Sequence, residues 1–229
     1  EGRIRLLLTL KTKRKRMKQK HFYIYNKVKS MASMVMLFIY WGILGTALQC
    51  LTSCDAENSI SKDYLCQFTF FCQNHSGNTL EIALKGLGSY TFVSVLYDKG
   101  WYIKSSPNDK RNYTEKIKIT TAIEIQELKK TCLGANNGII IGHTNFGGIV
   151  AYDRQCPNCI KNYGGTNYPL EWNTKDYSKV VCKKCHRTYE LENGIVENKQ
   201  EGDVKLMKYP ISYYNAVDKG MVISAKNRL

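Results

Sequence analysis

The chain has 229 residues, 43% of them hydrophobic, which is enough to bury the core of one globular domain. Its formal net charge is +15, but 11 of the 34 Lys and Arg residues lie within the first 30 positions. Residues 54–229 carry 23 basic and 18 acidic side chains and no basic stripe with interleaved aromatic residues. This charge distribution argues against nucleic-acid binding, so we expect no nucleic-acid partner.

Residues 1–30 form a basic, non-globular extension that includes the run KTKRKRMKQK and precedes Met31 and Met34. Two explanations stay open. The extension is either translated upstream sequence, with the start at one of those methionines, or an unusually long positive region of a targeting signal.

Residues 31–53 have the composition of a lipoprotein signal peptide: a positive region that ends at Lys29 precedes them, and they contain an apolar run over residues 34–48. The next residues, LTSC, resemble the bacterial lipobox, in which the cysteine becomes the lipid-modified first residue of the mature protein. The resemblance assigns lipid attachment to Cys54 and implies a membrane-anchored lipoprotein of the bacterial cell envelope, facing the periplasm or the cell surface. A permanent membrane-spanning anchor is the alternative, although the run is short for one. Residues 54–63 are small and polar and predict a tether.

The predicted domain, residues 64–229, opens on a strand with one buried face, because apolar side chains alternate along YLCQFTFFCQ, residues 64–73. Cys66 and Cys72 lie on this face about 20 Å apart in an extended chain, too far to form a disulfide with each other. One of them can pair with Cys132. We favour the alternative, in which they are free cysteines that fill the core.

Short strands, separated by turn signals such as Asp98-Lys99-Gly100, are typical of an all-β sandwich or barrel. A single short helix is predicted over residues 122–131. His143 follows an apolar run and is expected in the core or at its rim rather than at a metal. We predict further strands over residues 79–84, 90–97, 101–105, 116–120, 138–143, 147–153, 188–191, 202–209 and 220–225.

Two C-x-x-C segments predict a metal site: CPNC, which holds Cys156 and Cys159, and CKKC, which holds Cys182 and Cys185. We call them the first and second cysteine hooks; 22 residues separate them. A tight turn lets both thiolates of a hook point into one space, so two hooks can complete a tetrahedron around an ion. The alternatives are two disulfides or four unrelated thiols.

Residues 149–225 resemble a Rieske-type domain, an all-β fold in which two loops, each opening on a cysteine, meet over a metal centre. IVAYDRQCPNC resembles the strand that leads into the first loop. CKKCHRTYELENG resembles the second loop, with Cys182 at the first ligand position, and GDVKLMKYPISYY and GMVIS resemble the closing strands. The resemblance implies a Rieske-like antiparallel β sandwich or barrel with a two-loop metal-binding subdomain at residues 154–194.

The ligand set departs from the Rieske pattern, in which each loop supplies one cysteine and one histidine. The histidine positions hold Asn158 and Cys185 here, and His186 comes one residue late. Lys184 stands where the second loop would supply a cysteine for the loop-bridging disulfide. Four cysteines in two hooks match the zinc-ribbon or rubredoxin pattern instead, so Zn²⁺ is the favoured metal and iron or a [2Fe-2S] centre the alternative.

Basic residues surround the second hook, and we expect Lys183, Lys184, His186 and Arg187 to lie close to the metal ligands. Positive charge near a cysteine lowers its pKa and so stabilises the thiolate. The alternative is that the lysines are ordinary solvated residues of a loop.

Three functional classes agree with these patterns. The favoured one is an exported, lipid-anchored, non-catalytic binding or scaffold domain that touches the membrane through the lipid on Cys54. The second is an electron-transfer protein with iron or [2Fe-2S]. The third is a thiol oxidoreductase; the chain lacks the common hydrolase, phosphate-binding and dinucleotide-binding motifs, so we expect no catalysis.

Overall fold

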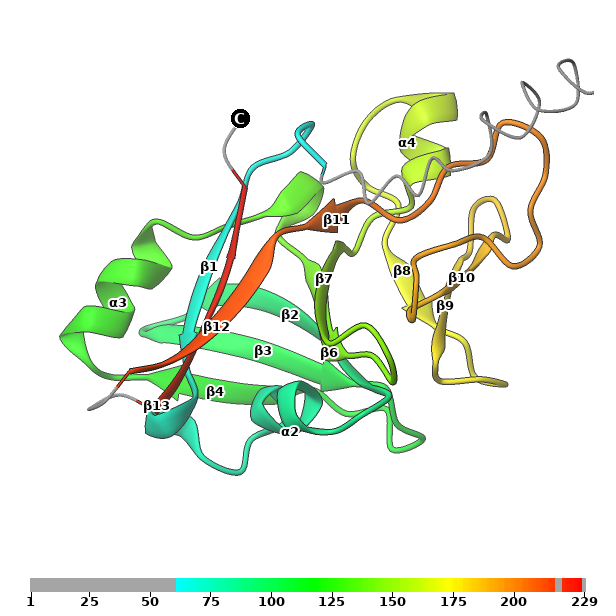
Figure 1. The fold of residues 1–229 in the computed structure, drawn as a ribbon. Helices are drawn as coiled ribbons and strands as arrows, with labels where there is room; N and C mark the ends of the chain where they lie inside the picture. The colour runs from blue at the N-terminus through cyan, green and yellow to red at the C-terminus, as the bar shows by residue number, and fades with distance from the viewer. Residues whose placement is uncertain (1–60, 217–219, 228–229) are drawn as a thin grey trace, which may run out of the picture. The chain divides into compact units, whose positions relative to one another are not determined.

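The computed structural model describes residues 61–216 and 220–227. The predicted extension, the signal peptide and Cys54 lie outside the described residues. Within them, three antiparallel sheets and a few short helices make up the fold (Figure 1), and none of the sheets closes into a barrel. The predicted all-β class is confirmed.

A six-stranded sheet lies at the centre of the described fold, and one core packs on each of its faces. Its strands lie in the order β11-β7-β6-β2-β3-β4, and each pairs antiparallel with its neighbour. The apolar run of β6 has no alternation because both of its faces are covered: Ile140 packs against one core and Ile139 and Ile141 against another. The strands span Ser89–Tyr97 (β2), Trp101–Pro107 (β3), Glu115–Ile119 (β4), Ile139–His143 (β6), Ile149–Asp153 (β7) and Lys208–Tyr209 (β11).

One face of this sheet is covered by a four-stranded sheet, which lies across it in Figure 1. Phe68 and Phe70 of β1 are 1% exposed and pack with Val93 and Ile103 in what we call the first core. Burying two phenylalanines and their neighbours stabilises this contact by about 2 kcal/mol per side chain. The strands span Cys66–Phe71 (β1), Cys132–Leu133 (β5), Ile211–Ala216 (β12) and Gly220–Lys226 (β13), in the order β12-β13-β1-β5.

The helix predicted over residues 122–131 is confirmed as α3 (Ala122–Lys129). The strand predicted over residues 79–84 is wrong, because this segment forms the helix α2 (Thr79–Lys85). Alternation along TLEIAL would bury Ile82, but Ile82 is 56% exposed and the buried residues follow helical spacing instead. The side chain of Asn78 caps the helix by accepting a hydrogen bond from the Glu81 N–H at 2.9 Å. Two short 3₁₀ turns, η2 (Cys72–His75) and η3 (Gly134–Asn136), lie after β1 and after β5.

The second face of the six-stranded sheet carries an insert between β7 and β11, in which the two hooks lie. It contains α4 (Pro157–Tyr163) and a three-stranded sheet of β8 (Leu170–Trp172), β9 (Lys179–Cys182) and β10 (Thr188–Glu190). Its apolar side chains pack with Phe92, Ile140 and Tyr152 in the second core, which includes three hook cysteines. The strand predicted over residues 202–209 shrinks to the two-residue β11.

The described cysteines outside the hooks, Cys66, Cys72 and Cys132, are free, as favoured from the sequence. Cys66 and Cys72 are buried in the first core, and Cys132 is exposed on β5. His143 sits at the rim of the first core, with Nδ1 3.0 Å from the carbonyl oxygen of Leu84, and takes no part in the group of hook cysteines. Among the described residues, no helix has the length and apolar character needed to cross a membrane.

Candidate metal centre

The first hook is built by the start of α4. Cys156 is the N-cap residue and Pro157 occupies the first helical turn, where its missing N–H costs nothing. The carbonyl oxygen of Cys156 accepts a hydrogen bond from the Ile160 N–H at 3.1 Å, and its own N–H donates to the Tyr168 carbonyl at 2.9 Å. Cys159 therefore lies one helical turn further on, with its thiol on the same side as that of Cys156.

The second hook is the turn between β9 and β10. Cys182 donates its N–H to the Arg187 carbonyl at 3.0 Å, and its carbonyl accepts the His186 N–H at 2.8 Å. His186 adopts a left-handed conformation with φ 57°, which reverses the chain within four residues. This tight reversal brings Cys185 back beside Cys182.

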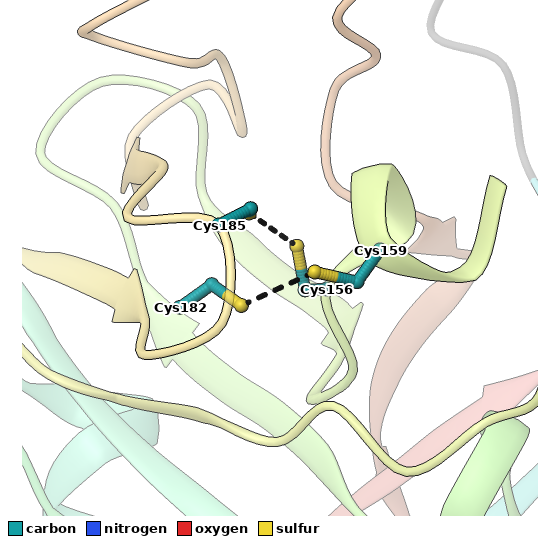
Figure 2. A group of neighbouring side chains, drawn as sticks. All are labelled: Cys156, Cys159, Cys182 and Cys185. Atoms are coloured by element: carbon teal, nitrogen blue, oxygen red, sulfur yellow. Dashed lines mark hydrogen bonds between the residues drawn. The ribbon is translucent and has the colours of Figure 1, made fainter. Parts of the chain in front are cut away.

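The two hooks face each other, and their four sulfur atoms form one group (Figure 2). All four Sγ atoms lie within 4.8 Å of one another, and each of two contacts joins one hook to the other: Cys156 to Cys185 and Cys159 to Cys182, both at 3.5 Å. These are free thiols, far beyond the 2.05 Å of a disulfide bond. Four thiolates at 2.3 Å from one zinc ion stand about 3.8 Å apart. The group thus has the size of a site for a single tetrahedral ion.

The surroundings separate the pKa values of the thiols. The pKa of Cys182 is lowered to about 5, because the neighbouring Cys156 thiol and the backbone N–H groups of Cys185 and Lys184 favour its thiolate form. The pKa of Cys156 is raised by the neighbouring Cys182 sulfur and by burial. Burial also raises the pKa of Cys159, to about 12. Backbone N–H groups within both hooks point at the first sulfur of the hook, an arrangement that favours thiolate ligands.

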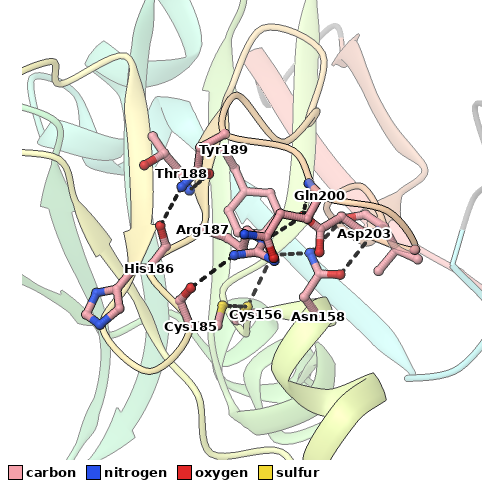
Figure 3. Close-up of polar contacts among 12 residues, drawn as sticks. Cys156, Asn158, Cys185, His186, Arg187, Thr188, Tyr189, Gln200 and Asp203 are labelled. Carbon is pink, nitrogen blue, oxygen red and sulfur yellow. Dashed lines mark hydrogen bonds and ion pairs between the residues drawn. The ribbon is translucent and has the colours of Figure 1, made fainter.

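A buried hydrogen-bond chain supports the first hook (Figure 3). The hydroxyl of Tyr189 lies 3.1 Å from the Cys156 sulfur and accepts a hydrogen bond from Asn158 Nδ2 at 2.8 Å. Asn158 also bonds to the backbone of Val204 in both directions, at 3.1 and 2.9 Å. Tyr189, on β10, therefore links the second hook's hairpin to the sulfur of the first.

The four residues expected beside the ligands have distinct surroundings. Arg187 forms an ion pair with Asp203 at 2.5 Å and also donates to the Cys185 carbonyl at 3.4 Å. Lys183 pairs with Glu171 at 2.6 Å, and the Lys184 ammonium lies 5.3 Å from the ring centre of Tyr163. His186 is exposed, and its ring extends away from the labelled cysteines in Figure 3, so it acts through its backbone.

Asp153, the last residue of β7, anchors the chain before the first hook. Its carboxylate is fully buried and accepts hydrogen bonds at 2.7 Å from the Ala135 N–H, the Tyr209 hydroxyl and the Gln155 N–H. Burial raises the pKa of Asp153 in spite of these bonds. The carboxylate thus ties β7 and β11 to the loop that delivers Cys156.

Sequence reasoning found the four cysteines that come together but missed the roles of Tyr189, Asn158 and Asp153. An available signal was the polar Asn158 inside an otherwise apolar hook, since a buried amide needs partners. No sequence pattern around Tyr189 predicts that its hydroxyl contacts the Cys156 sulfur.

We compared the chain with protein-family models, curated proteins and solved structures, and none of them matches it.

Proposed function

We propose that the chain is an exported, lipid-anchored, Rieske-like binding or scaffold domain in which one structural Zn²⁺ fastens two loops together. The observation that carries this proposal is the convergence of four sulfurs from both hooks within 4.8 Å. With four protein ligands a tetrahedral ion has no position left for water or substrate, which is typical of structural rather than catalytic zinc. Three of the four cysteines are buried, so the ion would be shielded from solvent.

The sulfur spacing favours one ion over a [2Fe-2S] cluster. A cluster places two irons and two sulfides between its cysteine pairs, and this needs more room than four sulfurs within 4.8 Å provide. A single iron ion fits the same tetrahedron, so electron transfer through a rubredoxin-type iron is the competing function.

The topology supports the Rieske-like part of the proposal. The hooks belong to an insert between β7 and β11, and the chain returns from it to β12 and β13, which pair with the first strand. Two cysteine loops that face each other at one end of an antiparallel β domain are what the resemblance implies.

Metal analysis of purified residues 55–229, kept anaerobic, tests the metal and its role. We expect about one zinc per chain and no visible absorption. Ser substitution of any one of the four hook cysteines should lower the zinc content and the thermal stability, whereas Cys132→Ser, at an exposed cysteine of β5, serves as the control and should change neither. Iron with visible bands would establish the electron-transfer alternative, and hook cysteines that react independently without metal would favour the oxidoreductase.

Lipid anchoring is supported by the LTSC segment and the apolar run before it. The test is metabolic labelling of the full chain with a fatty acid in a bacterial host. Label should be lost in Cys54→Ser and kept in Cys50→Ser, which removes a cysteine outside the lipobox position. Equal labelling of both variants would contradict the assignment of Cys54.

A further inference from the structure

A hollow in the molecule lies apart from the cysteines, where the end of β8 approaches the six-stranded sheet. Its volume is about 500 Å³, within the usual range of small-molecule sites. None of the hook cysteines lines it. The lining residues are Phe92, Ser106, Lys110, Asn112, Thr114, Arg154, Glu171, Trp172, Thr174 and Tyr177. We call this hollow the Arg154 cleft.

Aromatic stacking fixes the position of Arg154 in the cleft. The guanidinium carbon lies 4.2 Å from the ring centre of Phe92, and the Trp172 ring is stacked on Phe92 at 3.8 Å with 6° between the planes. Both groups cannot occupy one face of the ring, so Phe92 lies between them. The guanidinium is thus held rigidly before any ligand arrives, which lowers the entropy cost of binding.

Arg154 forms no ion pair with a carboxylate of the residues that the structure describes. Its Nε donates to the Leu170 carbonyl at 3.4 Å, and no carboxylate of residues 61–216 or 220–227 lies within 4.0 Å of the guanidinium. Glu171, the acidic residue of the lining, forms its ion pair with Lys183 at 2.6 Å and acts on Arg154 only from beyond ion-pair distance. A half-buried arginine without a carboxylate partner retains donors for an external anion.

The rest of the lining suits a hydroxylated anion. Lys110 adds a second positive charge, and Ser106, Thr114, Thr174 and Tyr177 place hydroxyl-bearing side chains along the wall. The indole N–H of Trp172 is buried and has no acceptor in the part of the chain that the structure describes. Ser106 and Thr114 bond to each other at 2.7 Å, and the lining carries the two positive charges of Lys110 and Arg154 against the one carboxylate of Glu171.

We propose that the Arg154 cleft binds a small oxyanion, a carboxylate or phosphate group carried by a hydroxylated molecule such as a sugar acid or a sugar phosphate. The planar guanidinium engages two oxygens of the anion, Lys110 adds charge, and the hydroxyl side chains bond to the body of the ligand. This site is independent of which metal the hooks hold. Together with the proposed lipid anchor, such a ligand would make the chain a membrane-anchored binding protein rather than a scaffold.

Calorimetric titration of the intact, metal-loaded protein with four probes tests the proposal: inorganic phosphate, glucose 6-phosphate, glucuronate and neutral glucose. We expect saturable binding of at least one anionic probe and none of glucose. Binding of glucuronate alone would identify a carboxylate ligand, and binding of the two phosphates alone a phosphate ligand. Absence of saturable binding for all three anions would overturn the proposal.

Two substitutions in the cleft and one control substitution test whether the anion binds there. Arg154→Met keeps an unbranched side chain without the charge and should weaken anion binding at least about tenfold, because two charge-assisted hydrogen bonds are lost. Lys110→Gln, at an exposed residue whose loss does not threaten folding, should weaken it by a smaller factor. Lys129→Gln, at an exposed residue of α3 outside the cleft, removes the same charge as a control and should leave affinity unchanged. Equal affinity of the wild type and both cleft variants would show that the anion binds elsewhere.

Discussion

Two buried tyrosines of the second core make a matched pair at the residue scale. The Tyr189 hydroxyl contacts the Cys156 sulfur and Asn158, whereas the buried hydroxyl of Tyr152 has no hydrogen-bond partner among the described residues. We expect Tyr189→Phe to lower the free energy of unfolding by about 1–2 kcal/mol and to speed metal loss to a chelator, because a buried donor and a ligand support are removed.

Tyr152→Phe is the control for this change, since it deletes the same atom from the same core. It should leave both stability and metal loss near the wild-type values. Urea unfolding and the rate of zinc transfer to a coloured chelator measure the two effects. Similar behaviour of the two variants would mean that the Tyr189 hydroxyl does not support the centre.

Asp153 gives a pH dependence with a definite sign. Burial raises the pKa of its carboxyl, so the folded protein holds this proton more tightly than the unfolded chain does. The contribution of Asp153 to the free energy of unfolding must then fall as the pH rises from about 4, the unfolded value, through the raised pKa. The stability difference between wild type and Asp153→Asn should accordingly decrease across this window in urea unfolding at several pH values; a difference that grows with pH would contradict it.

At the scale of elements, α2 depends on its N-cap. Asn78→Ala should lower the free energy of unfolding by about 1 kcal/mol, because the Glu81 N–H loses its acceptor. Asn78→Asp keeps an acceptor oxygen and should recover most of the loss. Thermal or urea unfolding of both variants checks the order, and equal destabilisation by Ala and Asp would exclude capping as the cause.

The same helix shows what the sequence could and could not predict. The alternating segments of β1, β3 and β4 and the helix α3 follow from side-chain periodicity, which is local. In TLEIAL the residues fit both alternation and a short helix, and the decision lies in the Asn78 cap and in the packing of Leu80 and Leu84 in the first core. The strands β8 and β9 escaped prediction because they are three and four residues long.

The candidate metal centre likewise has a part that the sequence predicts and a part that it does not. The four cysteines were predictable, because metal ligation needs particular atoms at short spacing within each hook. The contact of Tyr189 with Cys156 joins residues 33 apart, and that of Asn158 with Val204 joins residues 46 apart. Such contacts depend on the completed fold, and so does the stacking of Arg154 on Phe92.

At the scale of the whole described domain, the two cores predict separate responses to metal removal. The hook cysteines belong to the second core, whereas the first core between β1 and the six-stranded sheet contains none of them. After treatment with a strong chelator, backbone amides of α4, β9 and β10 should exchange hydrogen at least about tenfold faster, while those of β3 keep their protection.

Hydrogen exchange followed by mass spectrometry measures this difference. The variant Cys182→Ser should show the fast exchange before any chelator is added and no further change afterwards. If β3 lost protection together with β9, the two cores would unfold as one unit and the metal would hold the entire domain.

The pairing of β1 with β13 has a consequence for the order of folding. The Cys66 N–H donates to the side chain of Asn227, a residue 161 positions later, and Phe68 faces Ala225 across the ladder. The first strand therefore has no partner on its β13 side until nearly the whole domain has been made. At typical rates of synthesis this interval is about 10–30 s, during which the backbone groups of β1 on the β13 side lack their native hydrogen-bond partners. Folding that depends on contacts so distant in sequence is slow, so the nascent chain gains from a chaperone that holds β1 until β13 arrives.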